Sequence, residues 1–174
     1  MRQRVMDLLM ATKFLEVTEI KASQLAFEER VHLNCFHCIR YGVNWTCPPK
    51  IPQVDYQKLI CEYENLLLVY CKMPLTADKF EVVRRTSTNT LHHALLAAEK
   101  LLWESNYPLA ISFMGGSCKL CPEGCDELAC RHPDKARIPL EGIGVNVVKS
   151  AENVGLNIVF PPVDYMFRVG LLGW

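Results

Sequence analysis

Cysteine is the residue type most able to do chemistry in this chain, with nine copies among 174 residues. Four of them form a late group, Cys118, Cys121, Cys125 and Cys130, separated by two, three and four residues. Gaps this short let one loop wrap a metal centre and point its sulfurs inward, as loops do around iron–sulfur clusters. The spacing therefore predicts a metal centre bound by these four thiolates, and we interpret it first as a [4Fe-4S] cluster.

Zinc is the alternative metal for the late group. A structural zinc site usually joins two short Cys-x2-4-Cys turns across a longer spacer. The late group has no such spacer, so it resembles ferredoxin loops more than zinc ribbons, although its gaps differ from those of bacterial ferredoxins. A zinc site that serves only protein assembly stays open as a function.

An early group supplies three more thiols, Cys35, Cys38 and Cys47, the last followed by two prolines. Three thiolates leave one position of a four-iron cluster unassigned. In one alternative, a further protein ligand occupies that position. In the other, the position is open to a substrate, and the iron there could act as a Lewis acid. The candidate closing ligands are His32, His37, Cys61, Cys71 and the cysteines of the late group. With an open iron the chain would be an enzyme, and Tyr41, Asn44, Trp45 and Thr46 would line its substrate pocket.

The two groups could also share one centre. Cys35, Cys38, Cys118 and Cys121 are two Cys-x2-Cys pairs that could hold a single zinc ion. That arrangement leaves the other three clustered thiols unused. Seven clustered cysteines exceed the needs of one four-coordinate centre, so the sequence predicts two separate centres.

Several polar residues near the late group have two interpretations. These residues are Lys119, Arg131, His132, Lys135 and Arg137. They could offset the negative charge of a cluster or dock an acidic partner, or they could simply form a solvated loop surface. Cys61 and Cys71 are expected in the core. His92 and His93 are adjacent and cannot both face the core, so we place them at the surface or its boundary.

The cysteine groups and their neighbours resemble the DUF2284 family of predicted metal-binding proteins. The resemblance spans about residues 31–174 and implies metal or iron–sulfur binding in a prokaryotic cytoplasm, without indicating a reaction. The segments that carry it are Cys35-x2-Cys38, Tyr41-Gly42, Trp45-Thr46-Cys47-Pro48-Pro49, Gly115-Gly116-Ser117-Cys118-x2-Cys121, Cys125, Cys130-Arg131-His132-Pro133, Lys135-Ala136-Arg137 and Glu141-Gly142-Ile143-Gly144-Val145.

Composition excludes several classes of protein. Half of the residues are apolar, enough for a sizeable core, and nineteen basic residues balance nineteen acidic ones. A nucleic-acid partner normally requires a basic excess, so none is expected. No apolar run reaches the roughly 20 residues of a membrane span. The odd cysteine count and the lack of a secretory leader argue against a disulfide framework. We therefore expect a cytoplasmic protein.

Helices and strands must position the two cysteine loops. Hydrophobic patterning predicts helices at residues 2–10, 55–63, 78–81, 87–106 and 139–153, and strands at 14–20, 66–71, 109–114, 156–160 and 168–172. The expected fold is α/β or α+β, a single metal-binding domain over residues 1–174. A central sheet would support loops at about 34–53 and 115–139.

The predicted function follows from these elements. The chain is expected to be an iron–sulfur protein with one or two [4Fe-4S] clusters, serving electron transfer or redox support with a redox partner protein. Its apolar tail at residues 165–174 should be held either as a strand of the parent sheet or against a second subunit of a homo-oligomer.

Overall fold

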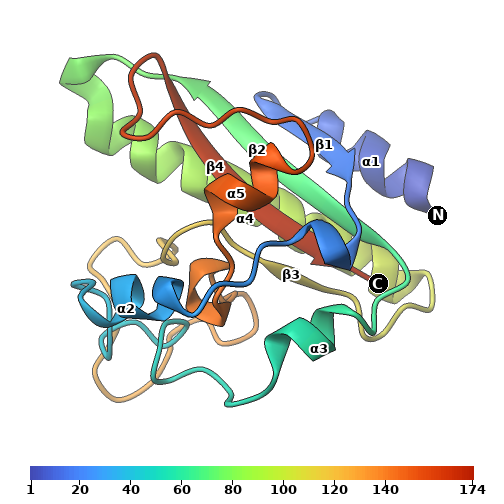
Figure 1. Ribbon diagram of the computed structural model, residues 1–174, viewed down its shortest axis with the longest axis horizontal. Coiled ribbons are helices and arrows are strands. Elements are labelled where there is room, and N and C mark those ends of the chain that lie inside the picture. The colour runs from blue at the N-terminus through green and yellow to red at the C-terminus, as the bar shows by residue number, and fades with distance from the viewer.

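Four antiparallel strands form the central sheet of the computed structural model, which describes residues 1–174 except for the side chain of Ala77 (Figure 1). In spatial order they are β1 (Leu15–Glu19), β2 (Leu66–Pro74), β4 (Tyr165–Gly173) and β3 (Ile111–Phe113). The mixed α and β fold with a central sheet is thus confirmed. The strand predicted at 156–160 is wrong, because that segment pairs with no strand and runs along the surface.

Strand β2 shows how the sheet acquires two buried faces. Side chains alternate along a strand, so Leu67, Val69 and Cys71 point to one face while Leu66 and Leu68 point to the other. The first set packs against two helices, α1 (Arg2–Met10) and α4 (Phe80–Glu104). Cys71 is therefore a core residue, as predicted.

The other face of the sheet carries short helices and irregular segments (Figure 1). The helices here are α2 (Arg30–Phe36), α3 (Tyr56–Ile60), η3 (Glu141–Ile143) and α5 (Val147–Glu152); two further single turns are η1 (Ala22–Gln24) and η2 (Ala77–Lys79). The helix predicted over 139–153 is interrupted because Gly144 adopts a left-handed conformation with φ +90°. α3 begins as predicted, since the Asp55 carboxylate accepts the Lys58 N–H at 2.9 Å.

The long helix α4 begins seven residues earlier than the predicted 87–106 helix, and the short helix predicted at 78–81 is divided between η2 and the start of α4. Asp78 does not cap it, because the residue before its first turn is Lys79. The early cysteine loop is also shorter than predicted, since α2 includes Cys35. Between Phe36 and Tyr56, and between Phe113 and Glu141, the chain forms turns and irregular structure without a named helix or strand.

The C-terminal segment is the strand β4 between β2 and β3, which confirms the strand alternative for the tail. Backbone hydrogen bonds between Asn65 and Trp174, at 3.0 and 3.1 Å, extend this pairing to the last residue. A subunit contact through the tail stays a prediction. Within the part of the chain that the structure describes, no helix combines the length and the apolar character needed to span a bilayer.

Candidate metal centres

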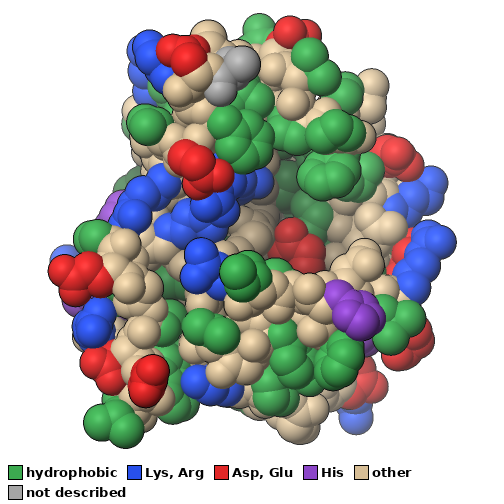
Figure 2. All heavy atoms as spheres, turned by 90° about the vertical axis from the view of Figure 1, so that its left-hand side faces the viewer, with side chains coloured by type: hydrophobic (Ala, Val, Ile, Leu, Met, Phe, Trp, Pro, Cys, Tyr) green, Lys and Arg blue, Asp and Glu red, His purple; other side chains and the backbone are tan. Residues whose placement is uncertain are grey.

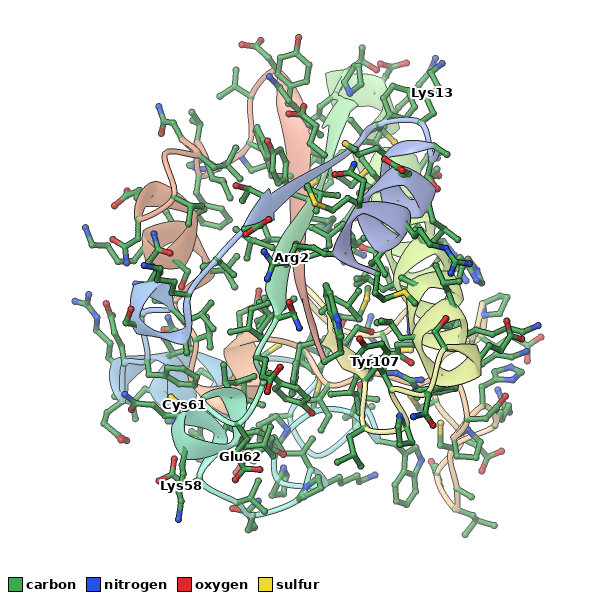
Figure 3. The ribbon with its side chains drawn as sticks, turned by 90° about the vertical axis from the view of Figure 1, so that its right-hand side faces the viewer. Arg2, Lys13, Lys58, Cys61, Glu62 and Tyr107 are labelled. Atoms are coloured by element: carbon green, nitrogen blue, oxygen red, sulfur yellow. The ribbon has the colours of Figure 1, made fainter. Side chains whose placement is uncertain are left out.

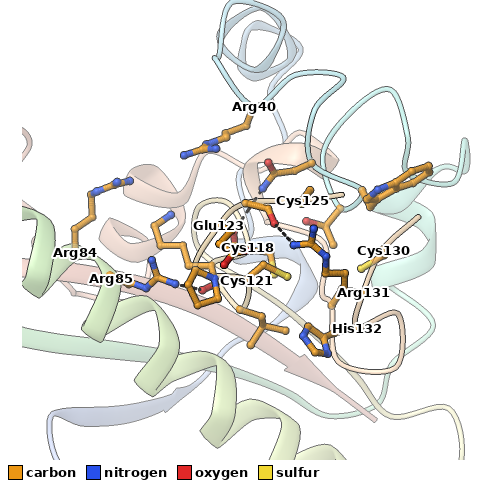
Figure 4. Close-up of a pocket in the computed structure, with 18 of the residues that line it drawn as sticks. Arg40, Arg84, Arg85, Cys118, Cys121, Glu123, Cys125, Cys130, Arg131 and His132 are labelled. Carbon is orange, nitrogen blue, oxygen red and sulfur yellow. Dashed lines mark hydrogen bonds between the residues drawn. The ribbon is translucent and has the colours of Figure 1, made fainter. Parts of the chain in front are cut away.

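The seven clustered cysteines line two cavities, divided as the sequence divides them. Cys118, Cys121, Cys125 and Cys130 line one of about 510 Å³, called here the four-thiol cavity (Figure 4). Cys35, Cys38 and Cys47 line another of about 650 Å³, the three-thiol cavity. Figure 2 shows the hollow in this face of the molecule, with Lys and Arg side chains gathered along one side. The two cysteine groups thus occupy different sites.

The four-thiol cavity is held open by polar contacts across its loop. Arg131 donates to the Gly124 carbonyl and the Asp126 carboxylate, both at 3.2 Å. The Trp45 indole N–H donates to the Asp126 carbonyl at 2.8 Å, which fastens the late cysteine loop to the early one. Arg85, on α4, donates to the Lys119 carbonyl at 3.5 Å. Helix α4 and the early loop therefore both position the late thiols.

Positive charge dominates the wall of the four-thiol cavity. Five basic side chains line it beside two acidic ones, Glu81 and Glu123; the basic residues are Arg40, Arg84, Arg85, Lys119 and Arg131. Figure 4 shows Arg84 and Arg85 on one side of the thiols and Arg131 on the other. Burial, reinforced by Arg84, Arg168 and Arg40, lowers the pKa of Lys119 to about 8. A wall with excess positive charge suits a centre that carries net negative charge.

The late thiols lie close enough to influence one another. Burial raises the pKa of Cys118, and the neighbouring thiols Cys125, Cys121 and Cys130 raise it further, while the Leu120 N–H lowers it. A bound metal ion reverses this effect, because its charge stabilises the thiolate form of each ligand. Four thiols that line one cavity are a donor set of the kind that binds metal centres.

Two of the basic residues predicted near the late group do not line its cavity. Arg137 is buried and forms an ion pair with Glu99 of α4, so its assignment to the metal loop surface is wrong. Lys135 is exposed and does not line the cavity; its carbonyl accepts a hydrogen bond from His92 Nε2 at 2.8 Å. His92 itself is fully buried, which corrects its predicted surface placement, whereas His93 is exposed as predicted. His132 does line the four-thiol cavity.

The three-thiol cavity is assembled from the end of α2, the turns after it and η3. Cys35, in the last turn of α2, donates its S–H to the Glu141 carbonyl at 3.4 Å. The Arg40 N–H donates to Cys38 Sγ at 3.5 Å. Burial, with the nearby Cys35 and Cys38 thiols, raises the pKa of Cys47 to about 12. Burial, followed by the Glu141 carboxylate and Cys38, also raises the pKa of Cys35.

A partnerless hydroxyl marks the edge of the three-thiol site. Thr46 Oγ1 is buried and has no hydrogen-bond partner among the described residues. It lies near enough to the Cys47 thiol to lower its pKa, although burial of that thiol has the larger, opposite effect. Buried polar groups are rarely left unpaired. A hydroxyl in this position could donate a hydrogen bond to a metal-bound sulfur. Hydrogen bonds of this kind help to set the reduction potential of iron–sulfur centres.

None of the predicted closing ligands lines the three-thiol cavity. His37 is exposed. The His32 ring packs beside Gly144, where an added Cβ would lie 2.9 Å from its Nε2. Cys71 is buried on the opposite face of the sheet. Cys61 is exposed just after α3, contrary to its predicted core position, and Figure 3 shows it there. The late cysteines line the other cavity.

A thin wall separates the two cavities. Thr46 lines the four-thiol cavity while the next residue, Cys47, lines the three-thiol cavity; Ser117 and Cys118 divide in the same way. Arg40 lines both cavities, and Asn44 Nδ2 donates to the Cys118 carbonyl at 3.4 Å, which joins the early loop to the late one. Residues that are adjacent in sequence line different cavities, so the two cavities adjoin.

The predicted substrate-lining residues divide between the cavities. Tyr41 lines the three-thiol cavity, as expected, but Asn44, Trp45 and Thr46 line the four-thiol cavity instead. The division falls between Thr46 and Cys47, which are adjacent in sequence and line different cavities.

Some residues of the site escaped the sequence analysis. Glu141 and Arg168 line the three-thiol cavity, and Arg84 and Arg85 of α4 line the other one. The arginines are far in sequence from the cysteines and carry no local signal. Glu141 did carry a local signal in the sequence, because it is the first residue of the Glu141–Val145 segment that contributes to the family resemblance.

Gly115 sets the position of the late loop against the sheet. A Cβ on Gly115 would lie 2.1 Å from the backbone oxygen of Val169 in β4, so a substitution must push the loop outward. We expect Gly115→Ala to lower the free energy of unfolding by about 1–3 kcal/mol or more and to reduce bound metal. Gly116→Ala is the matched control: it is strained by φ +76° but meets no atom within 4 Å. Chemical denaturation and metal analysis check both variants, and equal behaviour would contradict the role of the Gly115 contact.

Four thiols thus line one cavity and three line the other, and thiols are side chains that metal centres use as ligands. Among the described residues, no three His, Cys, Asp or Glu side chains converge closely enough to hold a metal ion. No curated protein and no solved structure matches the chain. Residues 18–172 match the sequence profile of DUF2284, described as a predicted metal-binding protein. With most of its length matched, the chain belongs to the DUF2284 family of predicted metal-binding proteins.

Proposed function

We propose that the protein binds two [4Fe-4S] clusters, one in each cysteine-lined cavity, and transfers electrons between them. The division of the cysteines into a set of four and a set of three, in adjoining cavities, carries the proposal. Cys118, Cys121, Cys125 and Cys130 would ligate one cluster, and Cys35, Cys38 and Cys47 would supply three ligands to the other.

Cavity size and charge favour clusters over single ions. The four-thiol cavity, about 510 Å³, is many times the roughly 30 Å³ that one water molecule occupies in the liquid. Its basic wall would offset the negative charge that thiolates and sulfides bring together. Net charge and hydrogen bonds to sulfur are among the properties that set a cluster's reduction potential.

The thin wall supports the electron-transfer part of the proposal. Cys47 and Cys118 lie on opposite sides of it, and the Asn44–Cys118 hydrogen bond gives a short path between their backbones. The basic side chains at the four-thiol cavity would also attract an acidic redox partner protein. We infer a cytoplasmic setting, where such a partner would be encountered.

A second candidate function is an enzyme that uses the three-thiol cluster as a Lewis acid. The volume of its cavity, about 650 Å³, favours this candidate because it lies within the range of small-molecule sites. Apolar residues including Val145, Phe160 and Phe167 line it beside Arg168. A small molecule that changes the spectrum of this cluster, and of no other, would favour the enzyme.

Metal identity tests the proposal. Protein purified without oxygen should contain about eight iron and about eight acid-labile sulfide ions per chain, since each [4Fe-4S] cluster contributes four of each. Reduced protein should give EPR signals from clusters that interact magnetically, because the two sites adjoin. Stoichiometric zinc with no labile sulfide would overturn the proposal and favour a structural zinc module.

A further inference from the structure

The three-thiol cavity contains a carboxylate that the cysteine pattern does not announce. Glu141 is the first residue of η3, and its carboxylate accepts the Gly116 N–H at 3.0 Å. Among the described residues, no Lys, Arg or His nitrogen lies within 4.0 Å of its oxygens. Within the described part of the chain, this partly buried carboxylate thus has one hydrogen bond and no ion pair, although Arg168 lines the same cavity, and it remains able to bind a positive centre.

The packing of η3 places Glu141 beside Cys35 and its neighbour Gly142 beside the proline that follows Cys47. On one side, its carbonyl accepts the Cys35 S–H at 3.4 Å. On the other, a Cβ on Gly142 would lie 3.4 Å from the Pro48 ring, and Pro48 directly follows Cys47. All three thiols and the Glu141 side chain line the same cavity. Three thiols and a carboxylate therefore line this cavity, and side chains of both kinds bind iron in proteins.

The other oxygen donors of this cavity are already engaged or neutral. Glu28, the second carboxylate that lines it, forms an ion pair with Arg30 at 2.5 Å and accepts from Asn146 at 3.2 Å. Ser117 and Tyr41 offer hydroxyl groups that are uncharged at neutral pH. Glu141 alone combines negative charge, a place among the thiols and the absence of an ion pair within the described residues.

We propose that Glu141 is the fourth ligand of the three-thiol centre, binding one iron of a [4Fe-4S] cluster through its carboxylate. This inference rests on the proposed function, because it requires a cluster in the three-thiol cavity. Carboxylates bind iron in proteins, but as harder ligands than thiolates. The iron at Glu141 is accordingly the most exchangeable of the four, and a substrate that enters the cavity would displace the carboxylate there.

The proposal predicts a specific change in the cluster rather than its loss. Glu141→Gln keeps an oxygen that can accept the Gly116 N–H, so the fold is preserved, but it removes the anionic ligand. We expect this variant to lose about one iron per chain and to show the EPR signal of an oxidised three-iron cluster after brief exposure to air. Glu141→Cys should restore the iron content and resist that conversion.

Glu28→Gln is the matched control, because it removes the other carboxylate of the same cavity. It should keep wild-type iron content and air sensitivity. The proposal is overturned if Glu141→Gln, folded by circular dichroism, matches the wild type in iron content and EPR, or if Glu28→Gln shows the same conversion. Wild-type protein without labile sulfide would instead overturn the proposed function, so the two failures are distinguishable.

Discussion

Replacing Glu99 by alanine should lower the free energy of unfolding by about 3–5 kcal/mol, the usual penalty for breaking a buried ion pair from one side. Glu99 is fully buried in α4 and pairs with Arg137, whose Nε lies 2.8 Å from Glu99 Oε1. The same carboxylate accepts the Ser112 N–H at 2.7 Å and the Ser112 hydroxyl at 2.5 Å. One side chain thus joins α4, β3 and the end of the late cysteine loop.

Glu104→Ala provides the control for this effect. Glu104 lies on the same helix, but its ion pair with Lys100, at 3.8 Å, is exposed. Exposed pairs of this kind contribute about 0–1 kcal/mol, so the variant should stay close to the wild type. Urea denaturation measures both proteins. A Glu99→Ala protein within about 1 kcal/mol of the Glu104→Ala protein would contradict the structural role of the buried pair.

Acid should destabilise the fold through His92, by about 3 kcal/mol between pH 6.5 and 4. Burial, reinforced by His93 and Arg137, lowers the pKa of His92 to about 4, although its hydrogen bond to Lys135 opposes the shift. Nε2 must be protonated to donate to the Lys135 carbonyl, and Nδ1 has no partner among the described residues. Over this pH range the unfolded chain binds a proton that the folded chain does not, so stability falls as pH falls.

The adjacent exposed histidine makes the acid prediction specific. Between pH 7 and 4, the wild type and His93→Gln should each lose about 3 kcal/mol more stability than His92→Gln, which has no buried group to titrate. Urea denaturation at several pH values measures the three slopes. Parallel curves for all three proteins would show that His92 does not govern this part of the acid response.

The sequence was sufficient to predict the parts of the fold that repeat a simple pattern. Hydrophobic patterning located β2, β3 and α3, because each of these patterns lies within a few consecutive residues. The predicted helix over 139–153 failed because a single left-handed residue, Gly144, divides it. Local spacing also sorted the cysteines, since the gaps within each group are short enough for one loop to span.

Contacts between distant residues were not predictable from spacing. Arg137 looked like a loop cation, yet it pairs with Glu99, 38 residues earlier, in the core. Glu141 lies beside Cys35 only because η3 packs on α2, and the two are 106 residues apart in sequence. His37 and Cys61 were candidate closing ligands, but the fold leaves both exposed and neither lines the three-thiol cavity.

The central claim is that the early and late cysteines hold separate clusters. Its most direct test is iron and sulfide analysis of anaerobically purified Cys121→Ser and Cys38→Ser beside the wild type. Each substitution should remove about four of about eight iron ions and leave the EPR signal of the other cluster in place, because the two cysteines line different cavities. Loss of all metal from a folded Cys121→Ser protein would contradict the account, because it would show that the two groups share one centre.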